Sequence, residues 1–333
     1  MKSCIWIGNP FFSNKLSQMG WEKVYVHTFV DFQLFTYADL VRLAGFEPDV
    51  VVVADKSMPP FVLGVEHFPC LTALYVVDSH VHSWFPLYAQ AFDCCLVSLF
   101  DHCSSFVSER LPKERILWSP PYAQDAYRPK GACDPVWDCL FVGTVSANTP
   151  KRAQFLAELG RILPNLYVTT GPFVELYPKA KVVLNFCEFG DLNFRVFEAM
   201  GLGAALVTPR IAQHQDSLFT DAFHYVLYDA QSPANAKSAI LRLLHDEMLR
   251  RQIQNNALAI IDQKHRASHR AKAFTEHIAS LWDARDQIIA ERIAQAPWIR
   301  EHSLRLLYCL WAKEMEDASI QQTYLAYAKG LIW

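Results

Sequence analysis

Short runs of β-branched and aromatic residues recur along most of the chain, each followed by turn residues and then by apolar residues at helical spacing. Parallel strands joined by crossover helices give this pattern, because both faces of such strands are buried. The sequence therefore predicts an α/β fold. The expected strands are residues 4–7, 24–26, 50–54, 74–77, 95–97, 116–118, 139–142, 166–169, 182–184, 205–207 and 225–227.

The chain is too long for a single hydrophobic core. It has 333 residues, and at about 150 residues per domain two domains are expected. Between residues 119 and 137, prolines and a glycine replace the apolar periodicity, as in an interdomain connection. We predict two similar α/β lobes facing each other across a cleft, the first at residues 1–128 and the second at 129–285.

The last segment, residues 286–333, has a helical pattern and is rich in Leu, Trp and Tyr. We expect this helical tail to pack on the lobes. Its apolar stripe also fits a helix lying on a membrane surface, so peripheral membrane contact stays an alternative.

Composition excludes several classes of protein. Hydrophobic residues make up 52% and charged residues 20%, so the chain is globular, and a net charge of −3 provides no global field for nucleic acid. The nine cysteines lack the spacing of metal ligands or of a disulfide framework. A signal-peptide core and an apolar run of membrane-spanning length are both missing from the sequence. A cytoplasmic protein with reduced thiols is the expectation.

The most informative stretch is residues 180–210, AKVVLNFCEFGDLNFRVFEAMGLGAALVTPR. A buried strand at 182–184 leads into a polar, glycine-containing loop, and open α/β sheets bind ligands at that end of their strands. A short helix should begin near Asn193 or Phe194 and end at Gly201 and Gly203. The unpaired N–H groups of a helix N-terminus suit a diphosphate. Arg195 in the first turn adds a phosphate donor, and Glu198 can accept hydrogen bonds from ribose hydroxyls.

This stretch resembles the nucleotide-sugar site of GT-B glycosyltransferases, in particular the spore-maturation CgeB-like branch of the glycosyltransferase group 1 superfamily. That branch has a strand ending in Leu-Asn, then Asp-x-Asn-x-Arg, Phe-Glu-Ala, a glycine and a strand ending in Thr. The matching residues here are Leu184, Asn185, Asp191, Asn193, Arg195, Phe197, Glu198, Ala199, Gly203 and Thr208. The resemblance implies two Rossmann-like lobes, a nucleoside-diphosphate sugar as donor substrate and no cofactor.

The resemblance extends more weakly over residues 139–280. CLFVGTVSANTPKR, at 139–152, resembles the first strand and loop of the family's donor domain, which implies that Lys151 and Arg152 face the diphosphate. HRASHRAKAF, at 265–274, resembles a stretch near the end of that domain. One position departs from many retaining members, which have two glutamates eight positions apart. The partner position of Glu198 is Gly190, with Asp191 next to it, so the sequence leaves the stereochemical outcome open.

LYVVDSHVHSW, residues 74–84, sets Asp78, His80 and His82 after a strand. On an extended segment the two imidazoles point to one side, which suits a divalent metal. Amidohydrolase barrels begin with the same pattern, so a metal-dependent hydrolase is an alternative. Such an enzyme needs further ligands at later strand ends, and neither His214 nor His224 follows a convincing barrel strand.

Under the GT-B resemblance the same residues lie on the acceptor side of the cleft. His80 matches a histidine that touches the transferred sugar in group 1 members, and Asp78 orients a histidine or acts as a base. His82 and the turn at Gly8 and Asn9, after the first strand, are further acceptor-side candidates. No metal site is then expected.

The leading hypothesis is a metal-independent hexosyltransferase in which Arg195, Lys151 and Arg152 offset charge on the leaving diphosphate. Its partners would be a nucleotide sugar and a glycan, lipid-linked or protein acceptor. A GT-B-like protein that binds nucleotide or glycan without catalysis is a third possibility. The base, the sugar and the acceptor are not encoded in any motif of the sequence.

Overall fold

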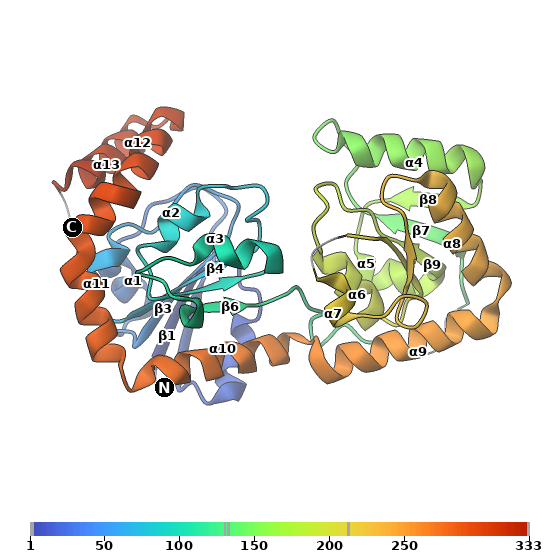
Figure 1. The fold of residues 1–333 in the computed structure, drawn as a ribbon, viewed down its shortest axis with the longest axis horizontal. Helices are drawn as coiled ribbons and strands as arrows, with labels where there is room; N and C mark the ends of the chain where they lie inside the picture. Colours follow the sequence, from blue (N-terminus) through green and yellow to red (C-terminus); the bar gives the residue numbers. More distant parts are fainter. Residues whose placement is uncertain (1–2, 130, 132–133, 212–213, 332–333) are drawn as a thin grey trace. The chain divides into compact units, whose positions relative to one another are not determined.

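A computed structural model describes residues 3–129, 131, 134–211 and 214–331 of the chain. These residues form two compact units (Figure 1). The first consists of the chain up to Pro120 together with the chain from Ala271 onward, and the second is Pro121–Arg270. The sequence placed the boundaries at 128/129 and 285/286. The observed change of unit between Arg270 and Ala271 falls inside the continuous helix Ala267–Trp282, where no turn residue marks it.

The first unit is built on a six-stranded parallel sheet in the order β2-β1-β3-β4-β5-β6. The strands are β1 (Ser3–Gly8), β2 (Lys23–His27), β3 (Val50–Ala54), β4 (Leu71–Val76), β5 (Cys94–Val97) and β6 (Ile116–Trp118). Each expected strand of this lobe is present. The connections contain η1 (Ser13–Met19), α1 (Tyr37–Ala44), η2 (Val65–His67), α2 (Phe85–Ala89), η3 (Phe100–His102), α3 (Cys103–Phe106) and η4 (Lys113–Arg115).

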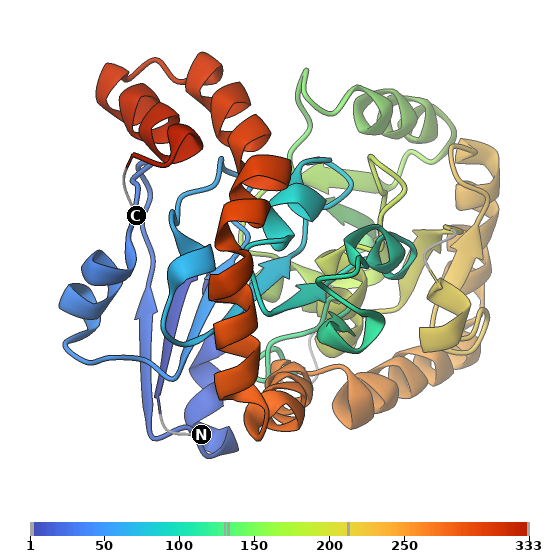
Figure 2. The same ribbon diagram turned by 60° about the vertical axis from the view of Figure 1, so that its left-hand side comes forward.

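The chain returns to the first unit through its C-terminal helices. These are α10 (Ala267–Trp282), α11 (Arg285–Ile299), the π-helical turn η6 (Arg300–Leu304), α12 (Arg305–Glu314) and α13 (Ala318–Lys329). Figure 2 shows α11 to α13 beside the elements of the first unit. Ile299, Leu307, Tyr308 and Tyr324 are buried in the same core cluster as alternate residues of the sheet strands. The expected helical tail is therefore part of the core of this unit.

A buried ion pair fixes α11 to the sheet. Arg292 and Asp93 are both fully buried and paired, and Arg292 also donates hydrogen bonds to the hydroxyl of Thr72 at 2.8 Å and to the carbonyl of Cys70 at 3.0 Å. Burying two charges is tolerated only when each finds partners. These contacts join residues about two hundred positions apart in the sequence.

The second unit has a five-stranded parallel sheet in the order β11-β10-β9-β7-β8. Its strands are β7 (Trp137–Val142), β8 (Leu166–Thr169), β9 (Ala180–Leu184), β10 (Leu206–Pro209) and β11 (Val226–Tyr228). Its helices are α4 (Pro150–Ile162), α5 (Phe173–Leu176), η5 (Tyr177–Lys179), α6 (Phe194–Gly201), α7 (Gln215–Leu218), α8 (Pro233–His245) and α9 (Glu247–Lys264). The strands expected from the sequence are again all present.

Successive side chains along the strands of the second unit point to opposite faces of the sheet, and each face has its own hydrophobic core. Leu140 and Val183 pack with α6 and α9 on one face, whereas Phe141 and Val182 pack with α4 and α8 on the other. The crossovers that follow β7 and β9 therefore lie on opposite faces of the sheet. No helix among the described residues is long and apolar enough to cross a bilayer.

The sequence HRASHRA fastens the start of the second unit to its end. Arg266 is 1% exposed, and its guanidinium donates hydrogen bonds to the carbonyls of Gln124, Tyr127 and Gly201 at 2.6–3.1 Å. The guanidinium of Arg270 donates a hydrogen bond of 3.0 Å to the carbonyl of Pro121. This motif has a structural role that its resemblance alone did not reveal.

Candidate functional site

The candidate site of the second unit lies where the strand order reverses. From β7 the chain moves outward to β8 and then returns to β9 on the other side of β7. Loops that leave two such neighbouring strands diverge and open a crevice at the carboxyl edge of the sheet, where α/β folds bind ligands. The loop after β7 leads into α4, and the loop after β9 leads into α6. Two helix N-termini thus meet this crevice.

The N-terminus of α4 is occupied by a carboxylate of the protein itself. Glu188, 6% exposed, accepts hydrogen bonds from the backbone N–H groups of Lys151 at 3.1 Å and of Arg152 at 2.9 Å. A carboxylate in this position pairs two orphan donors and complements the helix dipole. The N–H groups most suited to an anion at α4 are therefore already used.

The N-terminus of α6 has no such cap. Its N-cap residue is Asn193, as the sequence predicted to within one residue, but the side chain makes no capping hydrogen bond. The Asn193 amide instead donates to Oδ1 of Asn185 at 3.3 Å and to Sγ of Cys187 at 3.5 Å. The first turn of α6 is thus left without the side-chain oxygen that usually caps a helix.

The side chain of Arg195 bridges the ends of β7 and β9. Its Nε donates to the carbonyl of Val142 at the end of β7 at 3.1 Å, and its Nη1 donates to Oδ1 of Asn185 at 2.9 Å. The guanidinium carbon lies 5.1 Å from the ring centroid of Phe141. A side chain at Gly143 would place its Cβ 2.8 Å from Arg195 Nη2. The two hydrogen bonds and the ring of Phe141 thus hold this cation in place, and the lack of a side chain at Gly143 leaves room for it.

Asn185 is a buried residue that connects several side chains of the site by hydrogen bonds. It is completely buried and donates to the hydroxyl of Thr208 at 3.0 Å, while its Oδ1 accepts from Arg195 and Asn193. The sequence grouped Asn185 with the donor-binding residues. The hydrogen bonds that its Oδ1 accepts from Arg195 and Asn193 hold those two side chains in place.

The other basic residues lie on the α4 side of the crevice. Arg152 donates from Nη1 to the carbonyl of Thr144 at 2.8 Å, and its pKa is lowered by burial and by Arg195, against the opposing effect of Glu188 and then Asp191. Lys151 is exposed. Within the described residues, Nε of Arg152 and Oδ1 of Asn193 are buried polar atoms without a hydrogen-bond partner. A bound polar ligand would satisfy such atoms.

Glu198 lies one turn further along α6. Burial raises its pKa to about 7, although the nearby Arg195 acts in the opposite direction. The pKa of Tyr127 is raised by burial and, secondarily, by Glu198, which places the two groups near each other. Tyr127 packs edge-to-face on Phe173 with ring centroids 5.5 Å apart. Perturbed carboxylates beside aromatic rings are frequent in binding sites.

In the first unit, the candidate residues gather at the carboxyl edge of β3 and β4. Asp55, 4% exposed, follows β3 and accepts backbone N–H bonds from Ser57 at 2.7 Å, Val77 at 2.9 Å and Asp78 at 2.7 Å. The Ser57 hydroxyl in turn donates to the carboxylate of Asp78. Asp55 is absent from the site residues predicted from the sequence, although its position directly after a buried Val run is a signal for it.

The segment after β4 differs from the expected extended conformation. The N–H groups of Val81 and His82 both donate to the carbonyl of Asp78, at 2.9 and 3.1 Å, so residues 78–82 form a turn. The prediction that His80 and His82 project to one side of an extended segment is therefore wrong. Both side chains are half-buried, and the His82 ring packs against Trp84 and Phe85.

Gly8 and Asn9, at the end of β1, have backbone roles at this edge of the sheet. Gly8 has φ of +114°, and a Cβ there would lie 2.0 Å from the carbonyl oxygen of Ala54, so only glycine fits. The carbonyl of Asn9 accepts a hydrogen bond from Trp6 Nε1 at 2.8 Å.

The hydrolase alternative does not agree with this architecture. The chain forms two open parallel sheets rather than a closed barrel. Among the described residues, no three His, Cys, Asp or Glu side chains come together as a metal site requires. His214 and His224 belong to the second unit, whereas Asp78, His80 and His82 belong to the first.

Comparison with known proteins agrees with the observed architecture. Residues 142–276 match the family described as glycosyl transferase-like. The structure of Anabaena HepE in complex with UDP and glucose is similar over 84% of this chain and 100% of its own, with a TM-score of 0.61 and 13% identity. For sucrose-phosphate synthase from Thermosynechococcus elongatus the corresponding values are 85%, 100%, 0.58 and 11%. For a glycosyltransferase from Rickettsia africae they are 83%, 97%, 0.57 and 9%.

The fold is GT-B. The expected α/β class, the pair of Rossmann-like sheets and the helical C-terminal region are confirmed. No curated protein matches the sequence. The similarity to these solved structures concerns the fold alone, because the sequence identities are only 13%, 11% and 9%.

Proposed function

We propose that this GT-B protein is a metal-independent hexosyltransferase that uses a nucleoside-diphosphate sugar as donor. The observation that carries the proposal is the contrast between two helix N-termini at one crevice. Glu188 fills the N-terminus of α4, whereas that of α6 has no side-chain cap and lies beside Arg195. An uncapped helix N-terminus with an adjacent guanidinium suits a diphosphate.

Arg195 is the proposed electrostatic element of the reaction. Negative charge develops on the diphosphate as the bond to the sugar breaks, and a cation that is already fixed in place stabilises that charge without reorganising. The hydrogen bonds to Val142 and Asn185 supply this preorganisation. Because protein cations perform the task, we propose that no divalent metal is required.

The nucleoside is proposed to lie towards Glu198. Its carboxylate would accept hydrogen bonds from the ribose hydroxyls, and Tyr127 and Phe173 provide apolar surface nearby. A GT-B neighbour whose structure contains UDP and glucose supports a nucleotide-sugar donor for this chain.

On the acceptor side we propose that His80 contacts the transferred sugar and that Asp78 orients a histidine or acts as the base. Asp55 positions this segment through the N–H groups of Val77 and Asp78. We further propose that the chain belongs to the CgeB-like branch of the glycosyltransferase group 1 superfamily and is cytoplasmic. The proposed acceptor is a glycan, a lipid-linked molecule or a protein.

The direct test is thermal unfolding with UDP-, GDP- and ADP-sugars, with and without EDTA, followed by an assay for release of the nucleoside diphosphate. A ligand at one hundred times its Kd stabilises the folded protein by about 2.7 kcal/mol. We expect one donor class to raise Tm equally in both conditions and to be turned over. If none of these donors raises Tm, the proposal is wrong. Binding without turnover, with any acceptor supplied, would instead indicate a non-catalytic protein.

A further inference from the structure

The sheet of the second unit ends in an open edge at β8 (Figure 1). Doubly wound sheets commonly have the strand order 3-2-1-4-5-6, and β8, β7, β9, β10 and β11 correspond to strands 2, 1, 4, 5 and 6 of that order. A counterpart of strand 3 is not formed, because residues 170–179 lead from β8 through α5 and η5 directly to β9. Among the described residues, β8 pairs with β7 alone. The backbone on the outer side of β8 therefore has no partner strand.

Apolar side chains are exposed on both faces of this edge. Tyr167 is 45% exposed and Val168 is 40% exposed. Successive residues of a strand point to opposite faces, so these two side chains lie on different faces of the sheet. The Tyr167 ring stacks on Trp137 of β7 with ring centroids 5.1 Å apart. A partner that covers one face would leave Tyr167 or Val168 exposed, whereas an added strand contacts both.

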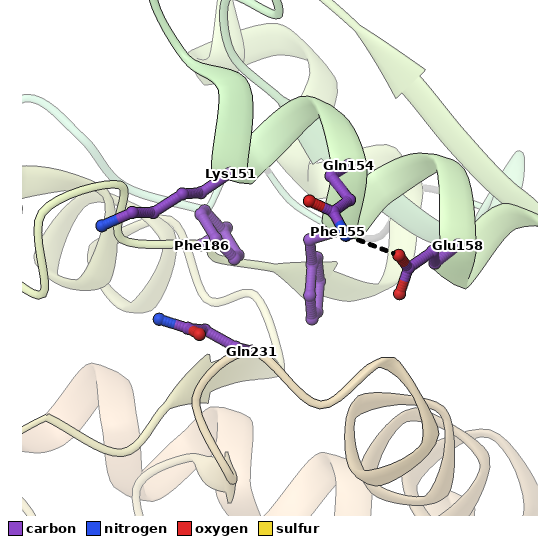
Figure 3. Close-up of a pocket in the computed structure, with 6 residues that line it drawn as sticks. All are labelled: Lys151, Gln154, Phe155, Glu158, Phe186 and Gln231. Atoms are coloured by element: carbon purple, nitrogen blue, oxygen red, sulfur yellow. Dashed lines mark hydrogen bonds between the residues drawn. The ribbon is translucent and has the colours of Figure 1, made fainter.

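Helix α4, on one face of this sheet, leaves the edge open. Phe155 of α4 packs beside Phe186, which follows β9 (Figure 3), and stacks on Tyr228 of β11, with ring centroids 4.8 and 5.6 Å apart. These contacts direct α4 towards the strands on the other side of β7 from β8. Val168 lies on the same face as Phe141, its partner in the register, and its exposure agrees with this placement of the helix.

The edge also lacks charged side chains. Residues 162–174, ILPNLYVTTGPFV, contain no Asp, Glu, Lys or Arg. Charged residues, lysine above all, are a common means of keeping an exposed edge strand from pairing with another chain. When two identical strands pair, a charge near the centre faces the same charge of the other copy, which is unfavourable. A segment without charges is therefore suited to pair with its own copy.

We propose that two copies of this chain join their β8 strands in antiparallel orientation and so form one continuous ten-stranded sheet from two five-stranded ones. Tyr167 faces its own copy at the two-fold axis, and Leu166 faces Val168 of the second copy. Aromatic and β-branched residues that lie directly opposite each other stabilise antiparallel strands. Because both copies use the same patch, association stops at the dimer. The inference does not depend on the proposed function.

Sedimentation velocity of the full chain over a range of concentrations measures the association. Tyr167→Lys and Tyr167→Glu each place two like charges opposite each other, and each should raise the dissociation constant of the dimer about tenfold or more. An equimolar mixture of the two variants brings opposite charges together and should dimerise again. Phe223→Lys, at a residue that is 47% exposed in the same unit, is the matched control and should dimerise as the wild type does. Circular dichroism checks that every variant is folded.

A cysteine at position 167 tests the register. Directly opposite residues of antiparallel strands have Cα atoms about 4.5–5.5 Å apart, within the range of about 4.4–6.8 Å that a disulfide spans. Tyr167→Cys should therefore form a covalent dimer under mild oxidation, as seen by non-reducing electrophoresis. Phe223→Cys should stay monomeric under the same denaturing conditions.

A wild type that is monomeric at every concentration overturns the proposal and leaves the edge to an extended segment of another protein. A dimer that is as stable in folded Tyr167→Lys as in the wild type places the interface elsewhere and also overturns it. If the two charged variants are folded monomers and their mixture stays monomeric, the two-fold pairing at Tyr167 is wrong.

Discussion

Oε2 of Glu188 accepts a hydrogen bond of 2.9 Å from the backbone N–H of Arg152, and this contact joins the loop after β9 to the first turn of α4. Oε1 of the same carboxylate accepts from Lys151. The loop that leads from β9 into α6 is thereby anchored to α4, the helix that follows the neighbouring strand β7.

Glu188→Ala should lower the free energy of unfolding of the second unit by about 1–2 kcal/mol, because α4 loses both its cap and the charge at its N-terminus. Glu188→Gln keeps one acceptor oxygen and should cost less. Denaturant unfolding measures both, with the exposed Glu175→Ala as control. An equal cost for Ala at positions 188 and 175 would contradict a capping role.

The affinity for a nucleoside diphosphate should rise with pH through about 7. The pKa of Glu198 is about 7 in the empty protein, and ribose hydroxyls bind better to the ionised carboxylate, so binding lowers that pKa and releases a proton. Calorimetry in buffers of different ionisation enthalpy detects the proton. Glu198→Gln should bind about tenfold more weakly or worse and show no such pH dependence.

The same carboxyl group predicts a dependence of stability on pH. Because folding raises the pKa of Glu198 from 4.5 to about 7, the empty folded state binds more protons than the unfolded state in that interval. Stability therefore falls as pH rises from about 4.5 to 7. Thermal unfolding across this range should show less of that fall in Glu198→Gln; an identical pH profile would contradict the raised pKa.

Arg195→Lys should reduce turnover by about 10²–10³-fold. The lysine keeps the charge but lacks the planar fork that reaches both Val142 and Asn185. Steady-state kinetics with the donor identified by thermal unfolding measures the loss. Arg210→Lys, an exposed arginine paired with Asp221, is the control. Turnover that survives Arg195→Lys at the level of this control would remove Arg195 from the mechanism.

Arg292→Met should destabilise the first unit by about 3–5 kcal/mol, because the buried Asp93 loses its ion-pair partner and keeps only the hydrogen bonds from Thr72. The double variant with Asp93→Asn should recover part of that loss. Chemical denaturation of the full chain measures both. If the double variant is less stable than Arg292→Met by the full cost of Asp93→Asn alone, the two charges are not coupled.

Local patterns were sufficient for much of the fold. A buried parallel strand needs a continuous apolar run, so the runs at Val50–Ala54 and Cys94–Val97 identified their own strands. The beginning of α6 at Asn193 followed from the polar loop and the helical spacing behind it. Such signals depend on neighbours in the sequence, and they also located Arg195 and Glu198.

The conformation of residues 78–82 could not be predicted in the same way. His-x-His is compatible with a strand or a turn, and the turn is selected by Asp55, which lies more than twenty positions earlier and holds the N–H groups of Val77 and Asp78. Likewise, nothing next to Glu188 in the sequence indicates that it caps a helix thirty-six positions away.

The sequence by itself determined the two parallel sheets, the helix at the switch point and the chemistry of its first turns, because each depends on side-chain periodicity and turn residues within a few positions. Tertiary structure alone decided which helix N-terminus is free of a cap, which arginines are structural and which unit the C-terminal helices join. These features depend on the contacts of Glu188, Arg266 and Arg292. Each contact is made with a backbone group or a buried charge that is far away in the sequence. Contacts of that kind have no local signature, since their partners become neighbours only after the chain has folded.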